Sequence, residues 1–204
     1  MSFSFYSAFV DPLLKEMRVR IPDFSGMKAG DKVLDICCGT GDQAFYYKKK
    51  GIVAVGIDLN PRMIETAEKR KEKEKADDVY FLPANAANLP FGNDFFDFAS
   101  ISLALHEITR KMRDEIISEM KRVVKKDGHL VFIDFSVPLP KKFNSFLIRG
   151  VEFLAGRKNF HNFRDYYNQG GLPLILKKNE QEEEKIEYLS QGLITVIKTK
   201  NIKD

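Results

Sequence analysis

Cysteine is scarce in this sequence and tryptophan is absent. Only two of the 204 residues are cysteines, Cys37 and Cys38, and they are neighbours in the chain. A disulfide between adjacent residues is strained, and no spaced set of cysteines is present, so we expect neither a disulfide framework nor a cysteine-based metal site. This composition fits a reducing compartment, and we expect a cytoplasmic protein that holds no metal.

Long hydrophobic runs and a strong excess of charge are also absent. The longest apolar runs fall far short of the roughly 18 residues that span a bilayer, and residues 1–10 lack the basic start and cleavage site of a signal peptide. The net charge of +4 is too small to favour a nucleic-acid partner. Hydrophobic residues make up 44% of the chain, enough for one globular domain. The oligomeric state cannot be predicted from the sequence.

What the sequence does contain is an alternation of apolar and helical segments. Buried strands are predicted over residues 32–37, 52–58, 79–82, 95–103 and 129–135. Helices are predicted between them, after the first strand as far as residue 50, over residues 62–75 and over residues 109–126, where Met112 and Ile116 begin an apolar stripe. Strands that are apolar on both faces and alternate with helices form a parallel sheet covered on both sides.

The pattern changes after residue 136. Helices are predicted over residues 143–154 and 164–176. Residues 185–188 and 193–198, separated by a turn at Gly192, predict a closing antiparallel pair of strands. We therefore expect a single α/β domain.

A loop of small residues follows the first predicted strand and reads DICCGTGDQA from Asp35 to Ala44. Small residues let a ligand approach the backbone, and the start of the next helix offers N–H groups to an anion. Asp58 ends the second strand 17 residues after Gly41, where a carboxylate can accept hydrogen bonds from both hydroxyls of a ribose. A helix N-cap is the alternative role for Asp58, but Asn60 already stands at the capping position.

Asp35 distinguishes two classes of nucleoside ligand. Residues 39–44 also satisfy the G-x-G-x-x-A pattern of dinucleotide-binding folds. A carboxylate four residues before Gly39 repels a pyrophosphate but attracts an ammonium or sulfonium group. The alternative, a buried aspartate with purely structural partners, is costly without a cation. We therefore predict a zwitterionic amino-acid nucleoside as the ligand, namely S-adenosylmethionine.

These residues resemble motifs I and II of the class I S-adenosylmethionine-dependent methyltransferases. The resemblance rests on the D-x-C-x-G-x-G run from Asp35 and on Gly56-Ile57-Asp58, and it continues through residues 85–91, 96–97 and 121–128. The sequence of these motifs most resembles that of the ubiquinone/menaquinone C-methyltransferase group. It implies a Rossmann-like three-layer sandwich with a seven-stranded, mostly parallel sheet and a C-terminal antiparallel pair.

The resemblance also implies how one methyltransferase domain is organised along residues 1–204. Residues 1–30 are expected to form an N-terminal cover, 31–135 the cofactor-binding core, 136–182 substrate-covering helices and 183–204 the closing strands. The expected cofactor residues are Asp35, Cys37, Gly39, Thr40, Gly41, Asp58, Leu59, Asn85, Ala86 and Ser102. Family members usually have glycine at the place of Cys37 and aspartate at the place of Asn85, whose amide oxygen still accepts a hydrogen bond from the adenine amine. We interpret both cysteines as small loop residues rather than nucleophiles.

Substrate residues are expected beyond the fourth strand and in the aromatic segments. His106 is the best-placed general base for a phenol, enol or amine, although a role as a hydrogen-bonded loop residue is the alternative. Leu105-His106-Glu107 is a departure from the quinone group. The expected substrate contacts are Tyr6, His106, His161, Arg164 and Tyr166.

Phenylalanine and tyrosine cluster in residues 3–9 and 143–167, the two segments that cover the substrate in this family. If they cover the acceptor rather than merely pack on the sheet, the substrate is a small apolar or aromatic molecule. The acceptor atom is not predicted. The alternatives are an RNA methyltransferase, an NADP-dependent oxidoreductase and a non-catalytic S-adenosylmethionine-binding module. The lysine-rich residues 48–50 and 69–75 are interpreted as solvated surface.

Overall fold

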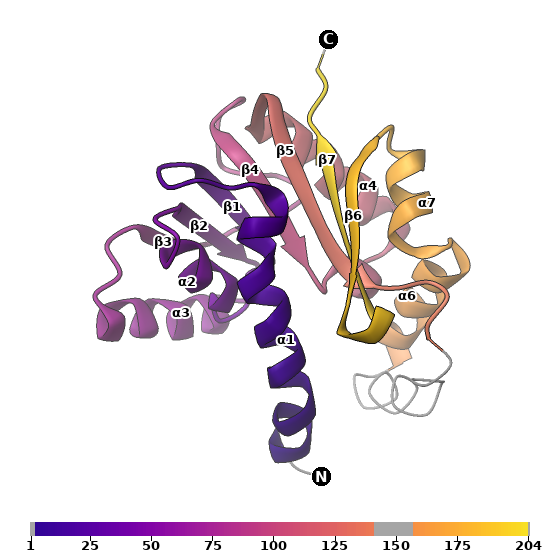
Figure 1. The fold of residues 1–204 in the computed structure, drawn as a ribbon, viewed down its shortest axis with the longest axis horizontal. Helices are drawn as coiled ribbons and strands as arrows, with labels where there is room; N and C mark the ends of the chain where they lie inside the picture. Colours follow the sequence, from indigo (N-terminus) through magenta and orange to yellow (C-terminus); the bar gives the residue numbers. More distant parts are fainter. Residues whose placement is uncertain (1–2, 141–156, 204) are drawn as a thin grey trace.

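A computed structural model describes residues 3–140 and 157–203, with side chains for residues 14–140 and 160–203. Within these residues seven strands form one sheet in the order β3-β2-β1-β4-β5-β7-β6 (Figure 1). The strands are β1 (Lys32–Ile36), β2 (Val53–Asp58), β3 (Val79–Pro83), β4 (Phe96–Ser102), β5 (Val124–Phe135), β6 (Glu183–Leu189) and β7 (Ile194–Lys200). Strands β1 to β5 are parallel, and β7 is antiparallel to both β5 and β6.

Helices cover both faces of the sheet. They are α1 (Phe3–Ser25), α2 (Asp42–Lys48), α3 (Pro61–Glu74), α4 (Arg110–Val123), α6 (Arg157–Asn168) and α7 (Gly171–Lys178), with short 3-10 turns η1 (Leu105–Glu107) and η3 (Ser190–Gly192). Ile21 of α1, Tyr47 of α2 and Ala67 of α3 pack into one core. Ile116 of α4, Tyr166 of α6 and Leu172 of α7 pack into the core on the opposite face. The predicted three-layer α/β fold, with its closing antiparallel pair, is confirmed.

The predicted helix over residues 109–126 is too long. Helix α4 ends at Val123, and β5 begins at Val124, which pairs with Phe96. The side-chain amide of Asn201 donates to the carbonyls of Lys121, Val124 and Lys125, and so fixes the turn from helix to strand. This contact comes from the far end of the chain, so the local pattern could not predict it.

The prediction of a single helix over residues 164–176 is also wrong. Two helices occupy this region, because Gly170 and Gly171 have left-handed backbone conformations with φ of 85° and 69°. A side chain at position 171 would meet Val137 at 2.8 Å, so the break is fixed by close packing as well as by backbone geometry. The helix predicted over residues 143–154 lies outside the described residues.

The apolar stripe predicted for α4 is wrong at its first position. Met112 is 38% exposed, whereas its neighbour Arg113 is buried. The guanidinium of Arg113 donates to the carbonyls of Leu105 and Asn162 and forms an ion pair with Asp165, so its charge is satisfied inside the protein. This arginine ties η1 to α6 beside the site described below.

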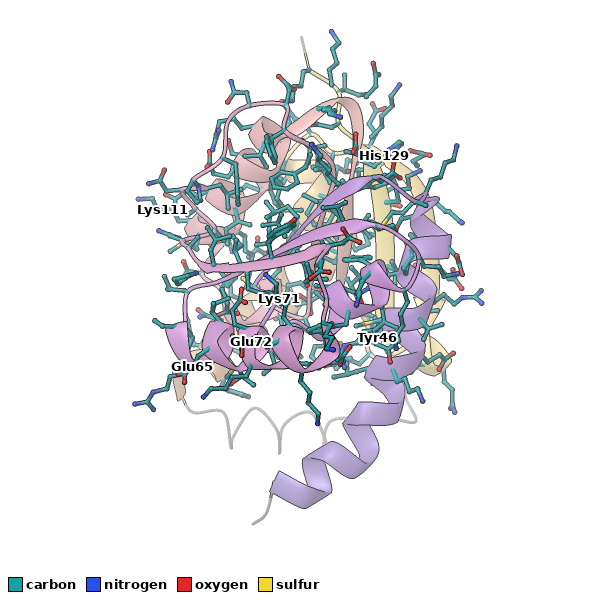
Figure 2. The ribbon with its side chains drawn as sticks, turned by 90° about the vertical axis from the view of Figure 1, so that its left-hand side faces the viewer. Tyr46, Glu65, Lys71, Glu72, Lys111 and His129 are labelled. Carbon is teal, nitrogen blue, oxygen red and sulfur yellow. The ribbon has the colours of Figure 1, made fainter. Side chains whose placement is uncertain are left out.

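Helix α1 extends beyond the sheet toward the N-terminus (Figure 1). No helix among the described residues is long and apolar enough to cross a bilayer. On α3, Glu65 and Glu72 are exposed, whereas Lys71 is half-buried and its ammonium group lies over the ring of Tyr80 (Figure 2). Lys69 pairs with Glu65 along the same helix, which agrees with a solvated surface.

Candidate functional site

The candidate site lies at the carboxyl ends of β1, β2 and β4, where the strand order of the sheet reverses. Two hollows open there. The Asp35 hollow, of about 340 Å³, is lined by Asp35, Gly39, Thr40, Gln43, Ser102 and residues of α1. The Asp58 hollow, of about 280 Å³, is lined by Asp58, Leu59, Asn85, Ala86, Glu107, Met112, Asn162 and their neighbours. Cys37 lines both hollows, so they share a wall.

The loop between β1 and α2 turns tightly because Cys37, Gly39 and Gly41 all have positive φ, of 56°, 54° and 77°. Gly41 immediately precedes α2, and a side chain there would clash with the ring of Phe81. This position therefore requires glycine both for its backbone conformation and for space. The tight turn exposes the loop backbone to the Asp35 hollow.

Asp58 holds the loop from the end of β2. One carboxylate oxygen accepts a hydrogen bond from the Gly39 N–H at 2.9 Å, and the other accepts from the Asn60 N–H at 2.9 Å. Asn60 in turn caps α3, since its side-chain oxygen accepts from the Arg62 N–H, as predicted. Each oxygen of Asp58 has a further lone pair, so the carboxylate retains the capacity to accept two more hydrogen bonds.

Asp35 is buried at the carboxyl end of β1, and one of its oxygens has no partner. It pairs in register with Ser100 of β4, whose hydroxyl donates to Asp35 Oδ1 at 3.1 Å. Asp35 Oδ2 makes no hydrogen bond although it is buried. Burial raises the pKa of this carboxyl group to about 7, because the charged form loses its hydration.

Two further buried polar atoms without partners belong to residues that line the Asp35 hollow. They are Gln43 Oε1 and Ser102 Oγ. Buried polar groups are nearly always hydrogen-bonded, so three such atoms around one hollow indicate a polar ligand. Two of the three are pure acceptors, which suits a ligand that donates several hydrogen bonds, such as an ammonium group. These residues therefore fit the amino-acid end of S-adenosylmethionine.

The residues predicted to bind adenine border the Asp58 hollow. Asn85 is exposed, and its side-chain oxygen accepts from the Ala87 N–H at 3.0 Å, which shapes the loop after β3. Leu59 is 74% exposed, so its apolar side chain is accessible to a ligand. Of the predicted cofactor residues, Gly41 alone lines neither hollow. Gln43 and Asn162 were missed, because no local pattern marks them.

His106 lies beneath the site in η1. Its Nδ1 is 2.6 Å from Asp134 Oδ1, and its backbone N–H donates to the other oxygen of Asp134 at 3.1 Å. The His106 residue is 5% exposed, and its imidazole lies against the rings of Phe135 and Phe163. It lines neither hollow, but its Nε2 is 3.8 Å from Oε1 of Glu107, which lines the Asp58 hollow. Asp134 was not predicted from the sequence.

The predicted substrate contacts are not gathered in one place. His161 and Arg164 are exposed on α6. Tyr166 is buried, and its hydroxyl donates to the carbonyl of Phe135 at 2.8 Å. The side chain of Tyr6 lies outside the described residues, as do the aromatic side chains of residues 3–9 and 143–153.

Both cysteines are free thiols beside the loop. Burial raises the pKa of Cys37 to about 12, and it raises the pKa of Cys38 still further. Both thiols are therefore protonated at neutral pH, which agrees with their interpretation as loop residues. Among the residues that the structure describes, no group of His, Cys, Asp and Glu is arranged to hold a metal ion.

Comparison with known proteins yields one family and several relatives. Residues 13–148 match the ubiE/COQ5 methyltransferase family. The ubiquinone/menaquinone biosynthesis C-methyltransferase UbiE of Francisella tularensis subsp. holarctica is 34% identical over 174 residues, 83% of this chain and 62% of that protein. The demethylmenaquinone methyltransferase of Halalkalibacterium halodurans is 30% identical over 173 residues, 81% of this chain and 66% of that protein. The match with the first relative thus spans only 62% of its length.

Solved structures share the fold at lower sequence identity. A SAM dependent methyltransferase from Aquifex aeolicus superposes with a TM-score of 0.70 at 19% identity, over 91% of this chain and 89% of that chain. The geranyl diphosphate C-methyltransferase from Streptomyces coelicolor A3(2), crystallised with S-adenosyl-L-homocysteine, gives a TM-score of 0.70 at 16% identity, over 96% of this chain and 83% of that chain.

Proposed function

Because the chain belongs to the ubiE/COQ5 methyltransferase family, we propose that it transfers a methyl group from S-adenosylmethionine to a ring carbon of a small hydroxylated aromatic acceptor. Membership of the family supports the predicted enzyme class and cofactor, and it disfavours the alternative of an NADP-dependent oxidoreductase. The names of the relatives support carbon as the acceptor atom and a quinone precursor as the acceptor.

The observation that carries the proposal is the set of unpartnered acceptors in the Asp35 hollow. In our assignment Asp35 and Gln43 accept hydrogen bonds from the ammonium group of the cofactor, and the loop at Gly39 lies against its amino-acid end. Asp58 accepts from the ribose hydroxyls. Leu59, Asn85 and Ala86 border the adenine in the Asp58 hollow, where Leu59 supplies an apolar surface.

When bound, S-adenosylmethionine supplies a methyl group activated by its sulfonium centre. The residues of this chain then orient donor and acceptor for in-line displacement and exclude water. A ring carbon becomes a stronger nucleophile when a neighbouring hydroxyl loses its proton, so the chain also needs a base.

We assign the base to His106. Asp134 accepts the hydrogen bond from Nδ1 and so fixes the tautomer in which Nε2 can accept a proton. Glu107 lies between this nitrogen and the Asp58 hollow in the proposed path, with its Oε1 3.8 Å from Nε2. In this assignment the proton leaves the acceptor hydroxyl, passes the Glu107 carboxylate and ends on the imidazole.

Calorimetry with S-adenosylmethionine and S-adenosylhomocysteine tests the cofactor assignment. We expect binding of both, with at least a tenfold loss in Asp58→Ala, because this change removes the ribose acceptor and the partner of the Gly39 N–H. Asp114→Ala, which removes a carboxylate of α4 that pairs with Lys178, is the matched control and should bind normally. Absence of binding at millimolar concentration contradicts the proposal.

A transfer assay with methyl-labelled cofactor tests the acceptor class. We expect label in hydroquinones and naphthols that carry an apolar side chain. Label in RNA alone would favour the RNA methyltransferase alternative. Binding of the cofactor without transfer to any acceptor would favour the non-catalytic module.

A further inference from the structure

A chain of buried hydrogen bonds leads from helix α2 to the Asp35 hollow. The Tyr47 hydroxyl donates to Ser100 Oγ at 2.9 Å, and the Ser100 hydroxyl donates to Asp35 Oδ1 at 3.1 Å. Tyr47 and Ser100 are fully buried, and Asp35 is 2% exposed. The three side chains come from three elements, α2, β4 and β1, so only the assembled fold brings them together.

The direction of this chain follows from its chemistry. A serine hydroxyl has one proton, so if it accepts from Tyr47 it donates that proton onward to Asp35. Burial raises the pKa of Tyr47 well above its usual value, which keeps its hydroxyl protonated and therefore a donor. Asp35 Oδ1 is thus engaged from within the protein, while Oδ2 of the same carboxylate has no partner.

From this arrangement we infer that Tyr47 and Ser100 are positioning residues, which orient the Asp35 carboxylate so that the site selects ligands with a cationic amino-acid group. The inference rests on the proposed function, which assigns the Asp35 hollow to the amino-acid end of the cofactor. It adds two residues, Tyr47 and Ser100, that affect ligand specificity without contacting the ligand. The site should favour S-adenosylhomocysteine strongly over 5′-methylthioadenosine, which has the same nucleoside and a thioether but no amino-acid group.

The charges around Asp35 support this selectivity. Asp42 and Asp58 lie close enough to raise its pKa, while Arg18 lowers it. Arg18 forms an ion pair with Asp42, a carboxylate that it shares with Arg70, and Arg70 also pairs with Glu74. The hollow is therefore suited to an added cation, and a fixed Asp35 oxygen gives that cation a defined partner.

A purely structural role for these hydrogen bonds would have different consequences for Asp35 and for ligand binding. A carboxylate that served only the core would have both oxygens satisfied, because an unpaired buried acceptor is costly. If these hydrogen bonds were only structural, their removal would also weaken the binding of all ligands of the site to the same extent. The two roles therefore differ in how the loss of these bonds affects ligands with and without the amino-acid group.

Calorimetry on Tyr47→Phe and Ser100→Ala with both ligands tests the inference. We expect each variant to bind S-adenosylhomocysteine about tenfold more weakly, since a hydrogen bond to a charged group is lost or misdirected. Binding of 5′-methylthioadenosine should stay within about twofold of the unaltered protein. The double variant should lose no more than the single variants, because both residues act through one chain.

Thr199→Val is the matched control. It removes another buried hydroxyl bond, from Thr199 to Gln181 at 3.0 Å, and should leave the affinity for both ligands unchanged. Unaltered binding of S-adenosylhomocysteine by both variants would overturn the inference, as would an equal loss for both ligands. Those results would leave the proposed function standing. Failure of the unaltered protein to bind S-adenosylhomocysteine would instead overturn the proposed function.

Discussion

At the scale of single residues, Asp35 shows how the needs of the fold and of the site conflict. Its carboxyl group is buried with one oxygen unsatisfied, and its pKa is raised from 3.8 to about 7. Because the raised pKa disfavours the charged form in the folded state, the stability contribution of this group is full below about pH 4 and is lost as the pH rises to about 7. The ligand-free fold is therefore weakened near neutral pH by a residue that the site needs.

Asp35→Asn should stabilise the ligand-free protein at pH 8, by on the order of 3 kcal/mol, because the amide carries no charge to desolvate. The same change should abolish measurable binding of S-adenosylhomocysteine. Urea unfolding at pH 8 and at pH 5 measures the first effect, which should be clearly smaller at pH 5. A variant that is less stable than the original at both pH values would contradict this account of Asp35.

The proposed role of His106 and Asp134 in proton transfer can be tested separately from cofactor binding. If the imidazole is the base, His106→Gln and Asp134→Asn should each lower kcat by about 100-fold. The affinity for S-adenosylhomocysteine should change little, since neither residue lines the two hollows. Transfer rates and calorimetry on the same preparations provide the comparison. Unchanged kcat in both variants would remove His106 from the mechanism.

At the scale of elements, the short turn η1 depends on a helix far along the chain. Arg113 of α4 bonds the carbonyl of Leu105 in η1 and that of Asn162 in α6, and the Asn162 side chain donates to the carbonyl of Glu107 at 2.7 Å. The turn that carries His106 is therefore held from outside. Its position is set by tertiary contacts and not by its own three residues.

Arg113→Met should destabilise the fold by about 3 kcal/mol, because it leaves the buried carbonyls of Leu105 and Asn162 without the guanidinium that donates to them. Arg110→Met is the matched control, since Arg110 pairs with Asp165, as Arg113 does, but from an exposed position. That change should cost no more than about 0.5 kcal/mol. Denaturant unfolding of the two variants gives the comparison, and equal losses would contradict the role assigned to burial.

At the scale of the whole molecule, the two hollows draw their walls from both helical layers. Residues of α1 and α2 line the Asp35 hollow, and residues of α4 and α6 line the Asp58 hollow. A ligand that fills both hollows therefore connects the two layers across the end of the sheet. S-adenosylhomocysteine at 100 times its Kd should raise the free energy of unfolding by about 2.7 kcal/mol. Thermal unfolding with and without ligand measures this, and an unchanged midpoint would contradict it.

The parts of the fold and of the site that the sequence predicted are those that local pattern determines. Asp35 and Asp58 lie at the carboxyl ends of β1 and β2, and Gly39 lies in the turn after β1, so their spacing was enough to place all three beside the hollows. Asp134 acts on His106 from 28 residues away, and Asn162 reaches Glu107 from 55 residues away. Such contacts depend on how elements pack, and for the same reason the end of α4 and the break before α7 were predicted wrongly.

Cys37 lines both hollows and therefore lies in the wall that they share. A ligand that extended from one hollow into the other would pass this residue, whose side chain is larger than that of a glycine. With φ of 56° the backbone there is also in a region that glycine occupies at no steric cost. A single exchange between cysteine and glycine would therefore change both the clearance along the ligand and the stiffness of the loop, without altering any charge in the site.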